Sequence, residues 1–587
     1  MLKCIIISIM LALIKNKKIN WWKIIFVIFV ATYALLILAK PNLGITNDVM
    51  FLRTLQAGKP VLLYSPDFPV FDPIKLGRFT PMGTIEYNLF GLFSKSPSAF
   101  WYFLLHAFQY AVFMVIFVKI LSKFTSNKFL IYITPVFLSL TPGMIVTWFL
   151  TLGNEKSLVF YLIIFLFFYL RYLEKPKLYY LIFGVISANV AIYCKENAFL
   201  ALAAFTFCHL LFSRKDNGKS LPSPNNSDDS QTKSPIFSNK ARIFDGLIIL
   251  SSISFPIVYF FYVFLPYQAA LVYGKTAANF VAIVKNILNF ATIVDPIMIL
   301  FILPLIGWRI YRIFIKREKP HVIYDSLLAT IPVFVAPFFL MNLYEFHYFT
   351  PTYVFAIPPL FYFIPKIWNK KLIWKILASM AGFLFLSNTL PFSLHFLTYS
   401  KYLPTNFNKT LNFLINEIKS KYPDQRIDIF IDGVESCGVN QTWPYFKLSE
   451  FLLYKGLTAE QFDLKSNQKK TPDCDSSIHD TKIPLDQFTV FQKGPLSEIS
   501  KGDYLIVSPE TTDDIKNNGN KDYLKNLNNE YNLVFRTKSA FAFPMLNLKE
   551  TIRYFLSVGA SPGQKFFGIR RKQPFMRWPD YYVFIKK

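Results

Sequence analysis

The fold of this chain is decided where its first apolar segment stops. Residues 22–48 read WKIIFVIFVATYALLILAKPNLGITND. Residues 22–40 are mostly apolar, and a helix needs roughly 20 such residues to cross the hydrocarbon core of a bilayer. Proline, glycine and the polar run Thr46-Asn47-Asp48 then end the segment. The stretch predicts a first membrane span, followed by a polar loop that begins with a carboxylate just outside the bilayer.

Similar apolar segments recur along the first two thirds of the chain. Hydrophobic residues make up 53% of the 587 residues, aromatic residues 18% and charged residues 17%, and the mean hydropathy is +0.35. This composition is typical of a polytopic membrane protein. About eleven spans are predicted, near residues 22–40, 99–118, 129–150, 157–170, 178–193, 197–212, 246–265, 295–314, 324–342, 351–365 and 373–393. A further apolar run at residues 4–14 is too short to span comfortably.

Lys and Arg are divided unevenly between alternate loops, and this sets the orientation. With the N-terminus inside, the short inner loops contain fifteen Lys and Arg and the short outer loops contain four. The inner loops are 119–128, 171–177, 309–319 and 366–375, and the outer loops are 151–156, 193–197, 266–294 and 342–350. Because cytoplasmic loops retain Lys and Arg, the N-terminus is predicted inside and the C-terminal part outside. Much of the net charge of +27 lies beside the membrane, so membrane lipids rather than nucleic acid are the expected partners.

The first outer loop, residues 41–98, contains the leading catalytic candidate, Asp48. Val49, Leu52 and Leu55 follow it at helical spacing, which predicts a capped amphipathic helix on the membrane surface. A carboxylate held at this place could act as a base. The alternative is that Asp48, or one of the two residues before it, only caps the helix.

Other polar side chains are expected on the same outer face. The first loop also contains Asp67, Asp72 and Glu86, with Arg78 before a second amphipathic piece at Met82–Phe93. Ionisable groups at a membrane edge are costly and are therefore functional candidates.

Two further candidates follow later in the chain. Lys195 and Glu196 lie between the fifth and sixth spans, and Glu345 and His347 lie at the head of the tenth. The alternatives are a turn in which Lys195 reaches to the interface and Glu196 caps a helix, and a structural histidine among aromatic residues.

The composition becomes that of a soluble domain after residue 398. The chain therefore divides into a membrane domain, 1–398, with a polar cytoplasmic linker at 213–242, and an extracytoplasmic α/β domain, 399–587. A helix is predicted at Asn408–Lys421, and strands are predicted around Ile427–Ile431, at Tyr504–Val507 and at Leu533–Phe535. Phe566–Lys587 is basic and aromatic, and we expect it on the lipid surface.

The five cysteines contain no metal-binding pattern. Cys437 and Cys474 share the outer domain, where an oxidising compartment would favour a disulfide between them. The chain has no glycine-rich phosphate loop, no Gly-x-Ser-x-Gly elbow and no carboxylate cluster with metal spacing. Nucleotide-driven work by this chain alone is therefore not expected.

Taken together, these features resemble the GT-C superfamily of membrane glycosyltransferases, which includes the protein O-mannosyltransferases and the bacterial aminoarabinose transferases. The shared features are an acid after the first span, surface helices in a long first loop, Lys195-Glu196 at a later span edge, Phe346-His347-Tyr348 opening a late span, and an outer α/β domain. The chain departs from the family in two places. Asn47 stands where many relatives have a second acid, and His347 stands where relatives often have Arg.

The resemblance implies an inverting glycosyltransferase of a bacterial cytoplasmic membrane. It would move a sugar from a polyprenyl-phosphate donor to a glycan, lipid or protein acceptor on the outer face. Asp48 is the implied base, Lys195, Arg78 and His347 are the implied phosphate ligands, and Glu196, Glu345, Asp67 and Asp72 would support them. No cofactor is expected beyond the lipid-linked donor, and the need for a divalent cation stays open.

Three other functions remain open. A polymerase or ligase of lipid-linked saccharides would share the architecture, although such proteins usually have their largest outer loop late in the chain. A transporter or flippase more often shows paired repeats and charges near mid-membrane, and neither is found in the sequence. A scaffold that only presents the outer domain would not need Asp48, Lys195 and His347 on one face.

Overall fold

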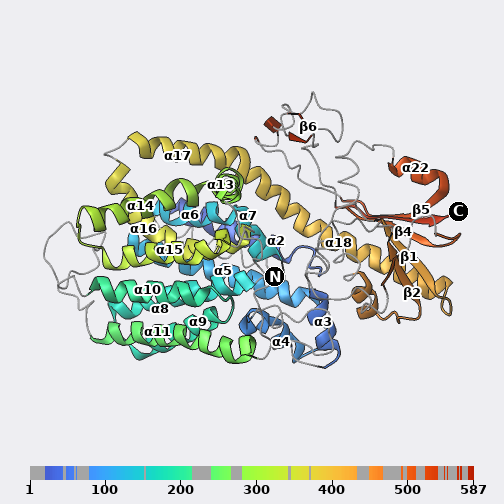
Figure 1. The fold of residues 1–587 in the computed structure, drawn as a ribbon, viewed down its shortest axis with the longest axis horizontal. Helices are drawn as coiled ribbons and strands as arrows, with labels where there is room; N and C mark the ends of the chain where they lie inside the picture. The colour runs from blue at the N-terminus through green and yellow to red at the C-terminus, as the bar shows by residue number, and fades with distance from the viewer. Residues whose placement is uncertain are drawn as a thin grey trace.

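The computed structural model has a bundle of helices at one end and a β-sheet at the other, joined by one long helix, α18 (Leu390–Lys421) (Figure 1). We call the part after this helix, residues 422–587, the outer domain, after the side of the membrane on which the sequence predicts it. The structure describes residues 20–43, 48–58, 61, 79–150, 154–213, 239–265, 280–340, 346–368, 372–432, 448–466, 491–493, 499–509, 523–539, 548, 551–552, 565–566, 569–570 and 579–587.

A helix lies at each of the eleven positions where the sequence predicts a span. The helices at the first seven positions are α2 (Trp21–Leu38), α5 (Ala99–Phe124), α6 (Lys128–Ser139), α7 (Pro142–Phe149), α8 (Asn154–Glu174), α9 (Leu178–Ile192), α10 (Ala198–Ser213), α11 (Asn239–Tyr259) and its π-helical extension η2 (Phe260–Phe264). They are followed by α13 (Phe280–Asn289), η3 (Phe290–Val294), η4 (Met298–Ile302), α14 (Leu303–Ile310), η5 (Tyr311–Ile315), α15 (Val322–Leu340), α16 (Thr352–Trp368), α17 (Leu372–Leu384) and η7 (Phe385–Thr389), which runs into α18.

Within the described residues, seven helices are long and apolar enough to cross a membrane. The pair α6 and α7 would make an eighth span if counted as one, and α9, α10 and part of α16 are shorter apolar helices. The pair is bent by 69° because Pro142 has no backbone N–H and starts a new helix, capped by Thr141. The chain thus has the predicted helical class. At three of the eleven predicted span positions the helix is shorter than a full span.

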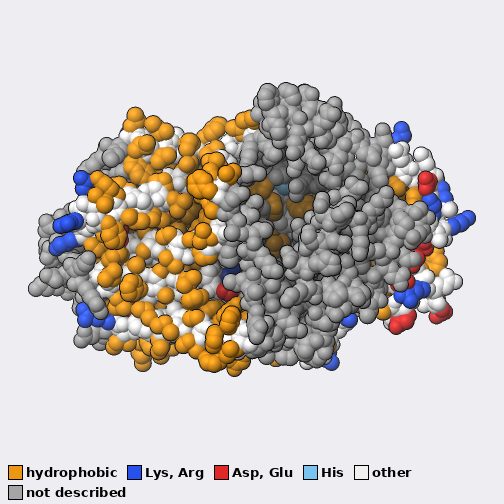
Figure 2. Space-filling view, viewed as in Figure 1, with side chains coloured by type: hydrophobic (Ala, Val, Ile, Leu, Met, Phe, Trp, Pro, Cys, Tyr) orange, Lys and Arg blue, Asp and Glu red, His pale blue; other side chains and the backbone are white. Residues whose placement is uncertain are grey.

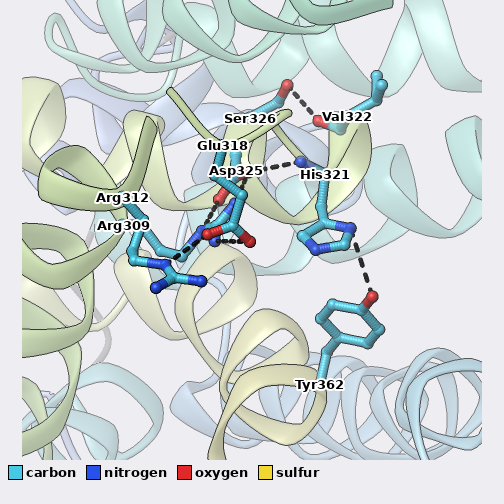
Figure 3. Close-up of polar contacts among 8 residues, drawn as sticks. All are labelled: Arg309, Arg312, Glu318, His321, Val322, Asp325, Ser326 and Tyr362. Carbon is cyan, nitrogen blue, oxygen red and sulfur yellow. Dashed lines mark hydrogen bonds and ion pairs between the residues drawn. The ribbon is translucent and has the colours of Figure 1, made fainter. Parts of the chain in front are cut away.

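Basic side chains gather at the end of the bundle opposite the outer domain, as Figure 2 shows. Arg309, which is counted above among the basic residues of an inner loop, does not face lipid, since it is buried and paired with Asp325. Its Nε and Nη2 each donate at 2.7 Å to the carboxylate of Asp325, and Nη1 donates to Glu318 (Figure 3). The backbone N–H of His321 also donates to Asp325, at 2.6 Å. This inner ion pair clamps α14 to α15.

The outer domain is built on a six-stranded sheet with the strand order β3-β2-β1-β4-β8-β5. The strands are β1 (Ile427–Asp432), β2 (Phe462–Ser466), β3 (Phe491–Lys493), β4 (Tyr504–Val507), β5 (Tyr531–Arg536) and β8 (Tyr582–Lys586), and the helix α22 (Tyr523–Glu530) precedes β5. Strands β1 to β4 are parallel, whereas β8 is antiparallel to both of its neighbours. A two-stranded ladder joins β6 (Lys565–Phe566) to β7 (Ile569–Arg570). The predicted strands are confirmed at β1, β4 and β5.

Two predictions for amphipathic segments are wrong. Residues 582–586, expected on the lipid surface, form β8, which lies between β4 and β5 in the sheet. Its Val583 and Phe584 are buried. The helix that begins at Asp48, α3 (Asp48–Gln56), does not lay its apolar stripe on lipid, because Val49, Leu52 and Leu55 are buried by protein. In both cases the apolar side chains are covered by segments far away in sequence, which no local pattern can reveal.

The predicted boundary at residue 398 falls inside α18, so one helix is continuous from the bundle into the outer domain. The predicted helix at Asn408–Lys421 is the second half of this element. Its outer half packs into the same core as the sheet, through Leu411 and Leu414. The two predicted parts of the chain therefore share a rigid connection.

Candidate functional site

The last part of the first loop is fastened to the end of the bundle nearest the outer domain. It consists of η1 (Pro81–Thr84) and α4 (Ile85–Gly91). The backbone N–H of Met82 donates to the carbonyl of Tyr193 at 3.1 Å, and that of Phe79 donates to Oε1 of Glu196 at 3.2 Å. These bonds hold the loop against the turn between α9 and α10, where Lys195 and Glu196 lie.

The loop also meets the start of α8. Nδ2 of Asn154 donates to Oγ1 of Thr80 at 3.0 Å, and Gly83 approaches the same amide so closely that a Cβ there would overlap it. A Cβ at position 83 would therefore force the loop or the Asn154 side chain to shift, and the close approach of the loop to α8 favours glycine here.

We expect Gly83→Ala to destabilise the protein by about 1 to 3 kcal/mol, because the loop must shift away from Asn154. Thermal unfolding of the purified protein in detergent measures this effect. Gly246→Ala is the matched control, since Gly246 in α11 has open space around it and alanine favours a helix. Equal melting temperatures for Gly83→Ala and the wild type would show that the loop does not need this contact.

Lys195 is buried at this end of the bundle and forms an ion pair with Glu155 of α8. Its Nζ also lies 3.8 Å from the centroid of the Tyr348 ring. His347, in the short helix η6 (Phe346–Phe349), brings Nε2 to within 3.9 Å of the other carboxylate oxygen of Glu155. Glu155 therefore lies between two of the three predicted phosphate ligands, which come from two other parts of the sequence.

A second buried group surrounds Glu86 of α4. Its carboxylate pairs with Lys156 and lies 3.2 Å from Nε2 of His106, and it accepts a hydrogen bond from Gln109 at 3.0 Å. Burial alone would raise the pKa of Glu86, but the charge of Lys156 and the hydrogen bond with His106 outweigh burial and hold the pKa well below its usual range. Glu86 is thus ionised at neutral pH and balances the charge of Lys156.

The two groups are joined because Glu155 and Lys156 are consecutive residues. We call the whole set the outer polar cluster: Glu86, His106, Gln109, Glu155, Lys156, Lys195 and His347. It gathers side chains from α4, α5, α8, the turn before α10 and η6. Buried charges are expensive to desolvate, and such groups in membrane proteins usually mark a site.

Asp48 is the first residue of α3, which packs on α4. The rings of Phe51 and Tyr87 lie 4.9 Å apart, and Leu55 shares a buried cluster with Tyr87. The helix that starts with Asp48 therefore rests directly on the helix that holds Glu86. The side chain of Asp48 lies outside the described part of the structure.

The remaining predicted site residues fall into two groups. Lys195, Glu196 and His347 are brought to one end of the bundle, beside the first loop. Outside the described residues lie Arg78, Asp67, Asp72, Glu345, Cys437 and Cys474. Within the described part, no group of three or more His, Cys, Asp and Glu side chains could hold a metal ion.

Sequence reasoning missed most of the outer polar cluster. In the sequence, Glu155 and Lys156 are only polar residues next to a predicted span, and Glu86 is only one of several acids in the first loop. A signal was present in α5, where His106 and Gln109 lie three residues apart on an apolar helix and so share one face. Polar residues at that spacing indicate a buried partner, although the spacing does not identify Glu86 as that partner.

Comparisons with known proteins give a limited result. No protein-family model matches the chain, and no curated protein matches it. Among solved structures, the oligosaccharyltransferase of Archaeoglobus fulgidus in its apo form is similar with a TM-score of 0.37 and 12% identity, over 84% of this chain and 70% of that chain. The same enzyme with a tethered acceptor peptide gives a TM-score of 0.37 and 12% identity, over 88% and 73%. Its complex with an inhibitory peptide and a dolichol-phosphate gives 0.36 and 12%, over 85% and 71%. Such values assign neither a family nor an activity, and the function has to be inferred from the residues of this chain.

Proposed function

We propose that the protein is a GT-C-type glycosyltransferase of a bacterial cytoplasmic membrane. It would transfer a sugar, with inversion, from a polyprenyl-phosphate donor to an acceptor on the outer face. The observation that carries this proposal is the outer polar cluster, which lies beneath the first loop and beside the helix that starts at Asp48.

Sugar transfer to a hydroxyl needs a base. The acceptor hydroxyl loses its proton as it attacks the sugar carbon, and a well-placed carboxylate contributes about 10² to 10⁴ in rate. Asp48 is the proposed base. Its place in the first turn of a helix supports this role in two ways. The helix dipole favours a charged carboxylate there, and the backbone hydrogen bonds of α3 hold the first turn in place.

The leaving polyprenyl phosphate needs fixed positive charge where negative charge develops. Lys195 is the proposed principal phosphate ligand, with Arg78 and His347 beside it. Glu155 would hold the Lys195 ammonium in place for the phosphate. Lys156 and Lys195 are balanced by Glu86 and Glu155, so the net positive charge for a phosphate would come from Arg78 and from protonated His347.

Glu196 would support the phosphate ligands indirectly, by fastening the backbone at Phe79 next to Arg78. The acceptor would enter from the outer side.

The proposal is tested by mass analysis of cell-surface glycans from cells with and without the gene. We expect one glycan to lose the mass of a single sugar in cells without the gene. Loss of a ladder of repeats would instead indicate a polymerase, and loss of a whole glycan would indicate a ligase or flippase. An unchanged profile would contradict the transferase and favour a transporter or scaffold.

Purified protein gives a second, independent measurement. With a polyprenyl-phosphate sugar and an acceptor extract, a transferase releases polyprenyl phosphate, whereas a flippase moves the intact donor across a vesicle membrane. Donor movement without release of the phosphate would contradict the proposed reaction.

A further inference from the structure

The segment between α2 and α3 lies along one face of α18. Nζ of Lys401 donates to the carbonyl of Ile37 at 2.6 Å, near the C-terminal end of α2. The buried Lys401 side chain thus satisfies a carbonyl at the end of α2. The negative end of the helix dipole favours a positively charged group at this place. The end of the first span is therefore fastened to α18.

The contacts continue along the same helix face. Nδ2 of Asn42 donates to Oγ1 of Thr405 at 3.0 Å, and Nδ2 of Asn408 donates to the carbonyl of Leu43. Positions 401, 405 and 408 are spaced by four and three residues, so they lie on one face of α18. Ile37, Asn42 and Leu43 are thus each bonded to the helix that enters the outer domain.

Helix α3 itself rests on the outer domain. Val49 and Leu52 are buried in the same core as Leu411 and Leu414 of α18 and Leu452 of the outer domain. Figure 1 shows α3 at the end of the bundle beside the outer domain. A membrane surface is therefore not what holds the helix that begins with Asp48.

Polar contacts fix the far end of α3. Nε of Arg53 lies 3.2 Å from Oε2 of Glu450, and Nε2 of Gln56 donates to the carbonyl of Tyr454 at 3.3 Å. Glu450 belongs to the helical segment 448–454 of the outer domain. The side chain of Glu450 is 16% exposed and that of Arg53 is 33% exposed, so this pair is partly protected from solvent.

We infer that the outer domain positions Asp48, with Arg53 and Glu450 as the positioning residues. The inference rests on the proposed function of Asp48 as the base. A base must be held within about 0.5 Å of its productive position, and a misplacement of about 1 Å can reduce the rate about 10²-fold. The outer domain and the outer half of α18 provide the rigid support that such a position needs.

The experiment compares charge reversal with charge exchange. Arg53→Glu and Glu450→Arg each place like charges together, and we expect each to lower kcat about tenfold or more with an unchanged KM for the lipid-linked donor. The double variant Arg53→Glu, Glu450→Arg restores the pair with reversed charges and should recover most of the lost kcat. A purely structural role would lower the amount of folded protein and leave the kcat of the folded fraction unchanged.

The ion pair of Arg426 and Asp463 is the matched control, because it is a partly buried pair within the outer domain that joins neighbouring strands. Arg426→Glu should leave kcat at the wild-type value once the folded fraction is taken into account. Wild-type kcat in both Arg53→Glu and Glu450→Arg would overturn the inference. An equal loss of kcat in Arg426→Glu would overturn it too, because the effect would then not be specific to the contact with α3.

Amide hydrogen exchange of residues 48–56 separates this inference from the proposed function, because it needs no activity. We expect faster exchange in each single variant and recovery in the double variant. If no transferase activity is found but this pattern holds, the outer domain still positions α3 and only the role of Asp48 is lost. Unchanged exchange in the single variants would remove the positioning role itself.

Discussion

Asp48→Asn is expected to abolish sugar transfer while the protein stays folded. An amide cannot accept the proton of the acceptor hydroxyl, so the loss should reach about 10²-fold to 10⁴-fold in kcat. The measurement is release of polyprenyl phosphate by the purified variant, together with its melting temperature.

The same substitution tests the alternative that Asp48 only caps α3. Asn is about as good a helix cap as Asp, so a capping role predicts nearly normal activity and stability for Asp48→Asn. Asp48→Ala removes both functions, and comparison of the two variants isolates the cap. Full transfer activity in Asp48→Asn would show that Asp48 is not the base.

Glu155→Gln is expected to have the second large effect. It leaves the buried ammonium of Lys195 without its carboxylate, and breaking a buried pair in this way costs about 3 to 5 kcal/mol. We expect a marked loss of stability together with a loss of transfer, because Lys195 would no longer be held in place. Chemical or thermal unfolding and a transfer assay measure the two effects separately.

The double variant Glu155→Gln, Lys195→Met then separates stability from function. Replacement of a buried ion pair by neutral side chains is often neutral or stabilising, so stability should return. Transfer should not return, since the proposed phosphate ligand is gone.

The inner ion pair of Arg309 and Asp325 is the control for this comparison. It is also buried, but Asp325 lies in the first turn of α15, whereas His347 of the outer polar cluster follows the other end of that helix. We expect Asp325→Asn to destabilise the protein, and Asp325→Asn, Arg309→Met to regain both stability and transfer. Transfer by Glu155→Gln, Lys195→Met at the wild-type rate would show that the outer polar cluster has only a structural role.

Much of the architecture could be predicted because the relevant signals are local. The length and apolarity of a run decide whether a helix forms, and a helix is found at each of the eleven predicted positions. The alternation of Ile427, Ile429 and Ile431 predicted β1 for the same reason, since side chains alternate between the two faces of a strand.

The predictions that failed concern which surface an amphipathic segment meets. The apolar stripe of α3 and the aromatic residues of 582–586 have patterns that suit a lipid surface as well as a protein core. Hydrophobic burial has no direction, so the pattern alone cannot tell the two apart. The structure shows that protein covers both segments.

By itself, the sequence determined the helical class and the positions of the helices. It also predicted that Asp48, Lys195 and His347 lie near the same end of the helix bundle. Only the tertiary structure decided that Lys195 pairs with Glu155, forty residues earlier, and that Glu86 meets Lys156, His106 and Gln109. The reason is physical. Secondary structure depends on neighbours within a few residues, whereas the partner of a buried charge depends on how distant helices pack, and a charge in an apolar bundle is stable only where that packing supplies the opposite charge.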